Sequence, residues 1–164
     1  MGSMAVAMPA CRAAQETSRP TPTVVRNADY VTLRSLSSES DAGHPTPVTL
    51  PYAGAGRAFA SREKLLDLNS FELSGARAVQ SASGNGSAGS YAVLIPLNPA
   101  GQRALGEWTS QNIGGQLGVF LEGTLIEAPR IRGRLDQAIV IGGSLGKAQV
   151  ERIAAALKRG GVPR

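Results

Sequence analysis

The sequence is poor in the side chains on which most enzymes depend: its 164 residues include one cysteine, Cys11, and one histidine, His44. A single cysteine excludes an internal disulfide framework and every metal site built from several cysteines. His44 lies between Gly43 and Pro45 in a polar stretch, a setting typical of a solvated loop histidine. Catalysis through a Ser–His or Cys–His pair is therefore disfavoured. We expect no enzymatic activity, no cofactor and no bound metal.

Aromatic side chains and long apolar runs are also scarce. Aromatic residues make up 4% of the chain, too few for the stacking platforms of single-strand binders, so nucleic-acid binding is disfavoured. No apolar run approaches the roughly 18 to 20 residues that cross a bilayer, so we expect the chain as given to be soluble. The apolar fraction of 42% still suffices for one core. A net charge of +5 favours acidic partners, such as anionic lipid head groups or acidic proteins.

The first 27 residues carry few large apolar side chains and are predicted to form a disordered tether. Met1-Gly2-Ser3 is typical of an expression tag. Small residues then lead to Cys11, which resembles the end of a secretory signal with a lipid-attachment cysteine, although Pro9 departs from that pattern. The alternative is an alanine-rich start with an incidental cysteine.

Residues 28–164 are predicted to form one domain, which is best defined over residues 64–164. Apolar and polar residues alternate over residues 30–36 and predict a strand, which a polar loop follows. Short extended segments are expected at residues 48–50 and 57–60.

The second half has clearer signals for strands and helices. Asn98 is a good N-cap and Pro99 fits the first position of a helix whose apolar face is Ala100, Ala104, Leu105 and Trp108. A last helix, capped by Ser144, has the inner face Val150, Ile153, Ala154 and Leu157 and ends at Gly160. Strands are predicted at residues 76–81, 91–97, 117–121, 124–127 and 137–141, and Gly123 supplies positive φ to the turn between the third and fourth. This order predicts an α+β two-layer sandwich, with a mostly antiparallel sheet and two helices packed on one face.

Two glycine-rich segments approach nucleotide-binding motifs but fit other structures better. Residues 84–89 match the spacing G-x-G-x-x-G, yet strand-like residues follow where a helix is required, so a hairpin loop is favoured. Residues 142–148 fall one position short of a P-loop, and Ala148 replaces the hydroxyl that would hold Mg²⁺. We expect no nucleotide hydrolysis. Anion binding by the backbone at this helix start is the alternative to simple capping by Ser144.

Arg130, Arg132 and Arg134 form the densest cationic feature of the chain, which we call the arginine strip. In an extended segment, spacing by two places all three on one face. The strip is interpreted either as a charged edge that discourages aggregation or as a binding surface to which the adjoining hairpin, with Glu122, contributes. Because Glu122, Glu127 and Asp136 lie in turns and loops, ion pairing with these arginines is favoured over acid–base catalysis. Trp108 is interpreted as a core residue.

From Tyr91 onward the sequence resembles the head subdomain of the first periplasmic domain of SecD and SecDF, a protein-export membrane protein family. The resemblance starts in a strand that leads into a helix, Val93-Leu94-Ile95-Pro96-Leu97-Asn98-Pro99-Ala100-Gly101. Thr109 and Gly115 match a late helical threonine and a glycine before the next strand. The family hairpin matches residues 117–129, with Glu122 in place of the usual aspartate, and the closing strand and helix match residues 139–143 and 148–163. Residues 66–78 match more loosely.

The resemblance implies a non-catalytic, periplasmic or cell-envelope protein that binds polypeptide or a protein partner, linked to protein export. Components of the Sec translocon and anionic membrane surfaces are the partners that it suggests. The transmembrane helices and the base half of the periplasmic domain have no counterpart in this sequence, so proton-coupled work is not expected of it. The alternative is a lipid-anchored or secreted structural or anion-binding module that reuses the fold. A hydrolase is a third class, which lacks a recognisable nucleophile–base pair.

Overall fold

The computed structural model describes residues 27–51, 56–80, 91–142 and 145–161. Its larger sheet has five antiparallel strands in the order β2-β3-β1-β6-β7. The alternating segment near the start of the domain forms its central strand, which pairs with β6 over six positions from Val31↔Leu121 to Leu36↔Gln116. The strands are β1 (Val31–Ser37), β2 (Thr46–Thr49), β3 (Arg57–Ala60), β6 (Gln116–Leu121) and β7 (Thr124–Glu127).

The turn between β6 and β7 has the predicted backbone. Gly123 has φ of 78°, and Glu122 has φ of 49°, so both turn residues are left-handed. Positive φ at both positions matches the twist of a two-residue hairpin.

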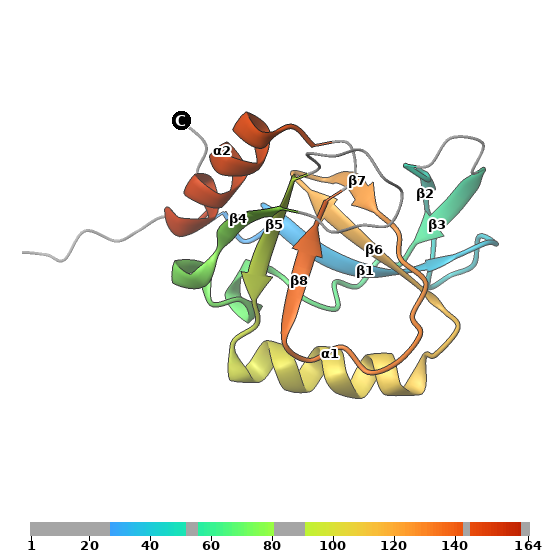
Figure 1. Cartoon of the computed structure of the whole chain (residues 1–164). Helices are drawn as coiled ribbons and strands as arrows, with labels where there is room; N and C mark the ends of the chain where they lie inside the picture. The colour runs from blue at the N-terminus through green and yellow to red at the C-terminus, as the bar shows by residue number, and fades with distance from the viewer. Residues whose placement is uncertain (1–26, 52–55, 81–90, 143–144, 162–164) are drawn as a thin grey trace, which may run out of the picture.

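The smaller sheet has three antiparallel strands in the order β4-β5-β8 (Figure 1). Its strands are β4 (Arg77–Gln80), β5 (Tyr91–Pro96) and β8 (Ala138–Ile141). The predicted hairpin of β4 and β5 is confirmed by pairs from Arg77↔Leu94 to Gln80↔Tyr91. One face of this sheet is core, since Val93, Ile95, Ile139 and Ile141 are at most 6% exposed. The α+β class and the antiparallel pairing are thus confirmed, with the strands divided between two sheets.

Helix α1 (Pro99–Gln111) begins as predicted, because Asn98 Oδ1 accepts the backbone N–H of Gly101 at 2.9 Å. The predicted face of α1 is partly wrong, since Ala100 and Ala104 are exposed. The buried residues are Gly101, Leu105, Gly106 and Thr109. At Gly101 the helix approaches its neighbour too closely for a larger side chain, because a Cβ there would lie 2.2 Å from the backbone oxygen of Ser70.

Helix α2 (Lys147–Lys158) begins two residues later than expected. Its N-cap is Gly146, which makes no side-chain capping bond, so the capping predicted for Ser144 is wrong; Ser144 itself lies outside the described residues. The helix ends as predicted at glycines of positive φ, with Gly160 N–H donating to Leu157 and Gly161 N–H to Ala156. These two bonds satisfy carbonyls at the helix end.

The two helices and both sheets share one core. The cluster includes Leu33 of β1, Val93 of β5, Leu105 of α1 and Leu157 of α2, and the predicted inner face of α2 is confirmed. Short 3₁₀ turns, η1 (Leu68–Ser70) and η2 (Leu73–Gly75), connect the sheets. In Figure 1, α2 lies at the upper left beside β4 and β5, and α1 runs along the bottom. Within the described part of the chain, no helix is long and apolar enough to span a membrane.

Candidate functional site

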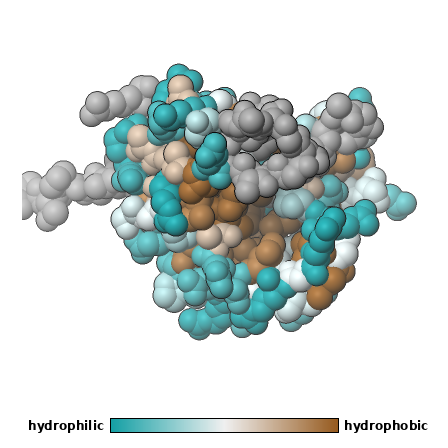
Figure 2. Space-filling view, in the orientation of Figure 1, coloured by the Kyte–Doolittle hydropathy of each residue, from teal (hydrophilic) through white to brown (hydrophobic). Residues whose placement is uncertain are grey.

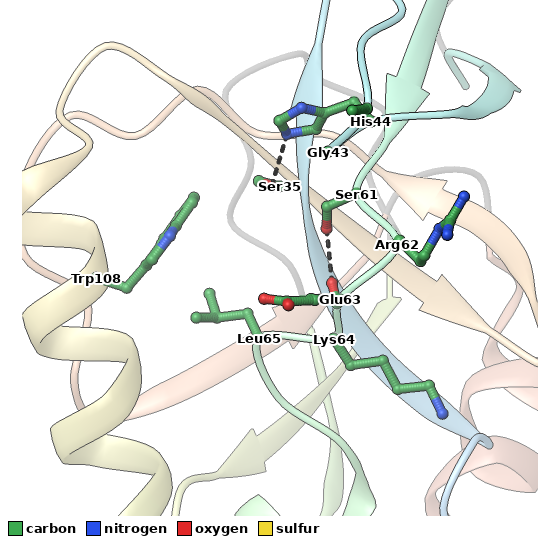
Figure 3. Close-up of a pocket in the computed structure, with 10 residues that line it drawn as sticks. Ser35, Gly43, His44, Ser61, Arg62, Glu63, Lys64, Leu65 and Trp108 are labelled. Carbon is green, nitrogen blue, oxygen red and sulfur yellow. Dashed lines mark hydrogen bonds between the residues drawn. The ribbon is translucent and has the colours of Figure 1, made fainter.

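A pocket of about 520 Å³ lies where the larger sheet meets α1 (Figure 3). Strand β1 contributes Ser35, the loop before β2 contributes His44, and α1 contributes Trp108. The segment that follows β3 forms the remaining wall, and its lining residues are Ser61, Arg62, Glu63, Lys64 and Leu65. Four elements of the chain therefore build this pocket, which we call the Trp108 pocket.

The side chain of His44 makes one hydrogen bond to the sheet and one within its own loop. Its Nε2 lies 2.9 Å from Ser35 Oγ, and its Nδ1 lies 3.1 Å from Asp41 Oδ1. The side chain of His44 is 24% exposed. The prediction of a simply solvated histidine is therefore wrong, because closure of the 41–44 loop brings His44 against β1.

Asp41 organises this loop mainly through the backbone. Its Oδ1 accepts the N–H groups of Gly43 and His44, each at 2.7 Å. These bonds, with those from the imidazole, hold the pKa of Asp41 below its ordinary value, the backbone bond from His44 being the largest cause. Asp41 is 58% exposed, so its charge is screened by solvent.

Ser35, His44 and Asp41 follow the hydrogen-bond order of an acyl-transfer triad. The surroundings of Ser35 offer little support for such a site, because two backbone N–H groups of the segment that pairs with this region are already hydrogen-bonded. Ser61 N–H donates to the Ser35 carbonyl at 2.9 Å, and Arg62 N–H donates to the Gly43 carbonyl at 2.9 Å. An oxyanion hole needs donors aimed at the developing charge, and these two are not available. The arrangement supports a structural tie that shapes one wall of the pocket.

The opposite wall of the Trp108 pocket is apolar. Trp108 and Leu65 are partly buried and pack against the main core. In Figure 3, Leu65 and Glu63 point toward Trp108, whereas Arg62 and Lys64 point to the other side of the extended segment. Trp108 therefore packs against the core and also lines the pocket. The prediction gave it only the first of these two positions. The pocket can receive an apolar group between Trp108 and Leu65, with hydroxyl, imidazole and carboxylate groups at its rim.

The arginine strip follows β7, and its backbone pairs with the start of β6 at Arg130 and Ile131 before it bends at Gly133. Arg130 and Arg132 are exposed on either side of Ile131, which is 2% exposed. Arg134 is also exposed, but its Nε donates to Asp136 Oδ2 at 2.7 Å, and its guanidinium lies against Gly106 of α1. Among the described residues, no ion pair is found for Arg130 or Arg132. The strip thus contains two cations available to a partner and one engaged locally.

The other predicted carboxylates do not join the strip. Glu127 accepts the Gly142 N–H at 2.6 Å, and burial raises the pKa of Glu127 while this bond lowers it. Glu122 follows the end of β6, whereas Arg130 pairs with Gln116 at its start, a separation of about 20 Å along the strand. Glu122 instead lines a second pocket, of about 510 Å³, with two arginines of the last helical segment. Ion pairing is therefore confirmed for Asp136 and not for Glu122 or Glu127.

Several predicted features lie outside the described residues: the tether with Cys11, the loop of residues 84–89, and residues 143–144 of the P-loop-like segment. Sequence reasoning missed Ser35, and it assigned His44 to solvent. Their contact depends on the loop conformation, for which the single signal is Asp41 two residues before Gly43, a pattern typical of side-chain-closed turns. In the described part of the chain, no cluster of three or more His, Cys, Asp or Glu residues could hold a metal.

Comparison with known proteins identifies the family and the fold of this chain. A family model described as the P1 head subdomain of SecDF matches residues 55–164. A crystal structure of SecDF in a super-membrane-facing form matches with a TM-score of 0.58 and 21% identity, over 79% of this chain and 18% of that one. A structure described as SecDF, a membrane component that enhances protein export, matches with a TM-score of 0.55 and 23% identity, over 79% of this chain and 62% of that one. No curated protein sequence matches significantly.

Proposed function

The chain belongs to the SecDF P1 head subdomain family, and from this premise we propose that it is a non-catalytic periplasmic module that binds polypeptide in protein export. The chain spans less than two thirds of each of the two SecDF structures described above. The export role therefore rests on the family and on one feature of this chain, the Trp108 pocket. Attachment through Cys11, and contact with Sec translocon components or an anionic membrane surface, are parts of the same proposal.

The Trp108 pocket has the size and chemistry of a site for polypeptide side chains. A volume of about 520 Å³ falls within the range of small-ligand pockets. An apolar side chain placed between Trp108 and Leu65 would leave water, and that transfer favours binding without requiring a defined sequence. The rim groups, Ser35, His44 and Glu63, offer hydrogen bonds to a peptide backbone. Such a site suits many unfolded segments rather than one ligand.

The protein's charge supports the same function. Its net charge of +5 attracts acidic segments, and Arg130 and Arg132 present cations on one exposed face. Charge of this kind increases the rate of encounter more than the final affinity. We therefore assign capture to the arginine strip and retention to the Trp108 pocket.

Trp108 is the only tryptophan of the chain, so its emission reports directly on the pocket. The experiment titrates the protein with a permanently unfolded, tryptophan-free polypeptide, reduced and carboxymethylated ribonuclease A. We expect saturable quenching or a spectral shift. Glu63→Arg places a longer side chain in the pocket, and Leu65→Ser removes its apolar wall; each should weaken binding about tenfold. Ile113→Ser, at a residue 63% exposed and outside the pocket, is the control.

The proposal fails if the native protein does not bind this polypeptide. It also fails if both pocket variants bind as tightly as Ile113→Ser. Thermal melting of each variant separates loss of the site from loss of the fold, and Glu63→Arg is the more informative variant because Glu63 is exposed.

Acyl hydrolysis is a second candidate function, favoured by the hydrogen-bonded order Ser35, His44 and Asp41. The occupied backbone donors beside Ser35 oppose it. A fluorophosphonate reagent followed by peptide mass spectrometry distinguishes the two functions. Labelling of Ser35 that disappears in His44→Ala would support a hydrolase, and the absence of labelling supports a binding module.

A further inference from the structure

The two sheets have four edge strands, and three of them carry features that discourage pairing with another chain. Strand β2 contains Pro47, β4 begins with Arg77, and β7 pairs with β6 across a register shift and ends in Glu127. Proline, charge and irregular pairing are the usual protections of sheet edges. Strand β8 has none of them, since its four residues are Ala138, Ile139, Val140 and Ile141.

The hydrogen-bond pattern fixes which backbone groups of β8 point to the open edge. Leu97 N–H donates to the Gln137 carbonyl at 3.0 Å, next to the register pair Pro96↔Ala138. In antiparallel pairing, hydrogen-bonded positions alternate along a strand. The backbone N–H and C=O groups of Ile139 and Ile141 therefore point toward β5, whereas those of Ala138 and Val140 point to the open edge. Pro96 fits this pattern, because it stands opposite a non-bonded position and lacks an N–H.

The outward backbone groups have no partners within the described residues. The N–H and C=O groups of Ala138 and Val140 form no hydrogen bond there. Two donors and two acceptors, alternating along an extended edge, are the complement of another extended backbone. Water can satisfy them in the free protein, but a strand satisfies all four with fixed spacing.

The surface beside this edge is apolar. Val140 is 48% exposed, and its register partner Leu94 lies on the same face of the sheet and is partly exposed. Leu135, which precedes β8, is 39% exposed. Figure 2 shows apolar side chains gathered in the middle of the face on which β8 lies in Figure 1. A chain paired with β8 would therefore place every second side chain against apolar surface.

We propose that an extended segment of unfolded polypeptide adds to β8 as a further strand of the smaller sheet, through the backbone of Ala138 and Val140. This inference rests on the proposed function and names how the polypeptide is held. The segment has apolar side chains at alternate positions and no proline at the bonded ones. Main-chain recognition gives affinity that does not depend on a particular sequence. A second copy of this chain fits the edge less well, because two copies of charge +5 repel each other.

Amide hydrogen exchange followed by NMR tests the backbone contact residue by residue. The probe is a short peptide of alternating valine and threonine. In the free protein, amides of Ala138 and Val140 should exchange quickly, and those of Ile139 and Ile141 slowly. The peptide should slow exchange at Ala138 and Val140 specifically. The same peptide with N-methyl groups on alternate nitrogens keeps its side chains but loses donors, and it should bind about tenfold or more weakly.

Val140→Lys tests the edge from the protein side. A lysine at this exposed position blocks strand addition without entering the core. Binding of the peptide should fall about tenfold or more, whereas Thr124→Lys, which adds the same charge to exposed Thr124 of β7, should leave it unchanged.

Three results would overturn the inference: equal binding of the N-methylated peptide, unchanged exchange at Ala138 and Val140, or equal binding by Val140→Lys. Sedimentation that shows a dimer abolished by Val140→Lys would also overturn it, in favour of a second copy at the edge. If carboxymethylated ribonuclease A binds and depends on the Trp108 pocket while these tests fail, the proposed function stands and the β8 inference alone is wrong.

Discussion

The Nε2 atom of His44 lies 2.9 Å from Ser35 Oγ, and this bond connects the loop before β2 to the central strand of the larger sheet. The imidazole also contacts Asp41, so one side chain closes the loop and lines the pocket. His44→Ala should destabilise the protein by about 1–2 kcal/mol in urea unfolding, because it removes a partly buried hydrogen bond to Ser35 and an exposed one to Asp41. Ser35→Ala should have a smaller effect. A double-mutant cycle should give a coupling energy above about 0.5 kcal/mol, and additive effects would contradict the tie.

The pH dependence of stability should carry the signature of Asp41. Hydrogen bonds lower the pKa of Asp41 in the folded state, so its contribution is present above the unfolded pKa of about 3.9. The contribution is lost as pH falls through the lower folded pKa. Asp41→Asn should therefore flatten the loss of stability between about pH 4 and pH 2. Unfolding free energies measured across this range check the prediction, and identical slopes in both proteins would refute it.

Glu127 should have the opposite pH signature. Burial raises the pKa of Glu127 in the folded state. The protonated carboxyl therefore contributes to stability at low pH, and this contribution is lost as pH rises through the folded pKa. Glu127→Gln keeps an oxygen for the Gly142 N–H but carries no charge. The variant should be more stable than the native protein at pH 7 and equal to it near pH 3. Melting temperatures at the two pH values test this, and lower stability at pH 7 would contradict it.

Gly101 is expected to tolerate no side chain. A Cβ at this position would lie 2.2 Å from the Ser70 carbonyl oxygen, so Gly101→Ala forces α1 away from η1. We expect a loss of about 1–3 kcal/mol, despite the gain in helix propensity. Gly106→Ala is the matched control, because its Cβ would meet only the flexible end of Arg134. That control should be nearly neutral or stabilising in urea unfolding, and equal losses in both variants would contradict the argument.

Much of the fold was predictable because its signals are local. Alternation gave the strands, and Asn98, Gly123 and Gly160 marked helix and turn boundaries through backbone preferences that act within a few residues. The buried face of α1 was not predictable in full, since Ala100 and Ala104 look apolar but are exposed, while Gly101 is required by the close approach of the Ser70 backbone. The same limit applies to the division into two sheets, which depends on long-range pairing.

The site was less predictable than the fold. Trp108 was recognised as an apolar helix residue, but its second role requires the segment after β3 to lie beside α1. The cationic strip was recognised from its spacing, but the bend at Gly133 and the pairing of Arg134 with Asp136 set Arg134 apart from Arg130 and Arg132. Both features depend on contacts between segments, and neither segment's sequence indicates that it will contact the other.

Helix α2 should contribute strongly to stability. Leu157 is fully buried in the core shared by both sheets, and Leu157→Ala should cost about 2–5 kcal/mol because it leaves a cavity. Glu151→Ala, at an exposed position on the same helix, should change stability by less than about 0.5 kcal/mol. Chemical denaturation measures both. A loss below about 0.5 kcal/mol for Leu157→Ala would show that α2 is not docked on the sheet in solution.

The arginine strip should influence capture of polypeptide in a salt-dependent way. Arg130 and Arg132 are exposed on one face without an ion pair among the described residues, so replacing both with serine should weaken binding of carboxymethylated ribonuclease A and flatten its dependence on salt. The reason is that attraction between surface charges is screened over about 8 Å at physiological ionic strength. Either replacement alone should matter little, since exposed charge pairs contribute about 0–1 kcal/mol. Arg134→Ser distinguishes a structural role from a role in binding. It removes the hydrogen bond to Asp136, so it should lower the free energy of unfolding more than the affinity for polypeptide. Fluorescence titrations at low and high salt measure the effect. If the double variant keeps both the affinity and the salt response of the native protein, the strip protects the surface from aggregation and takes no part in binding.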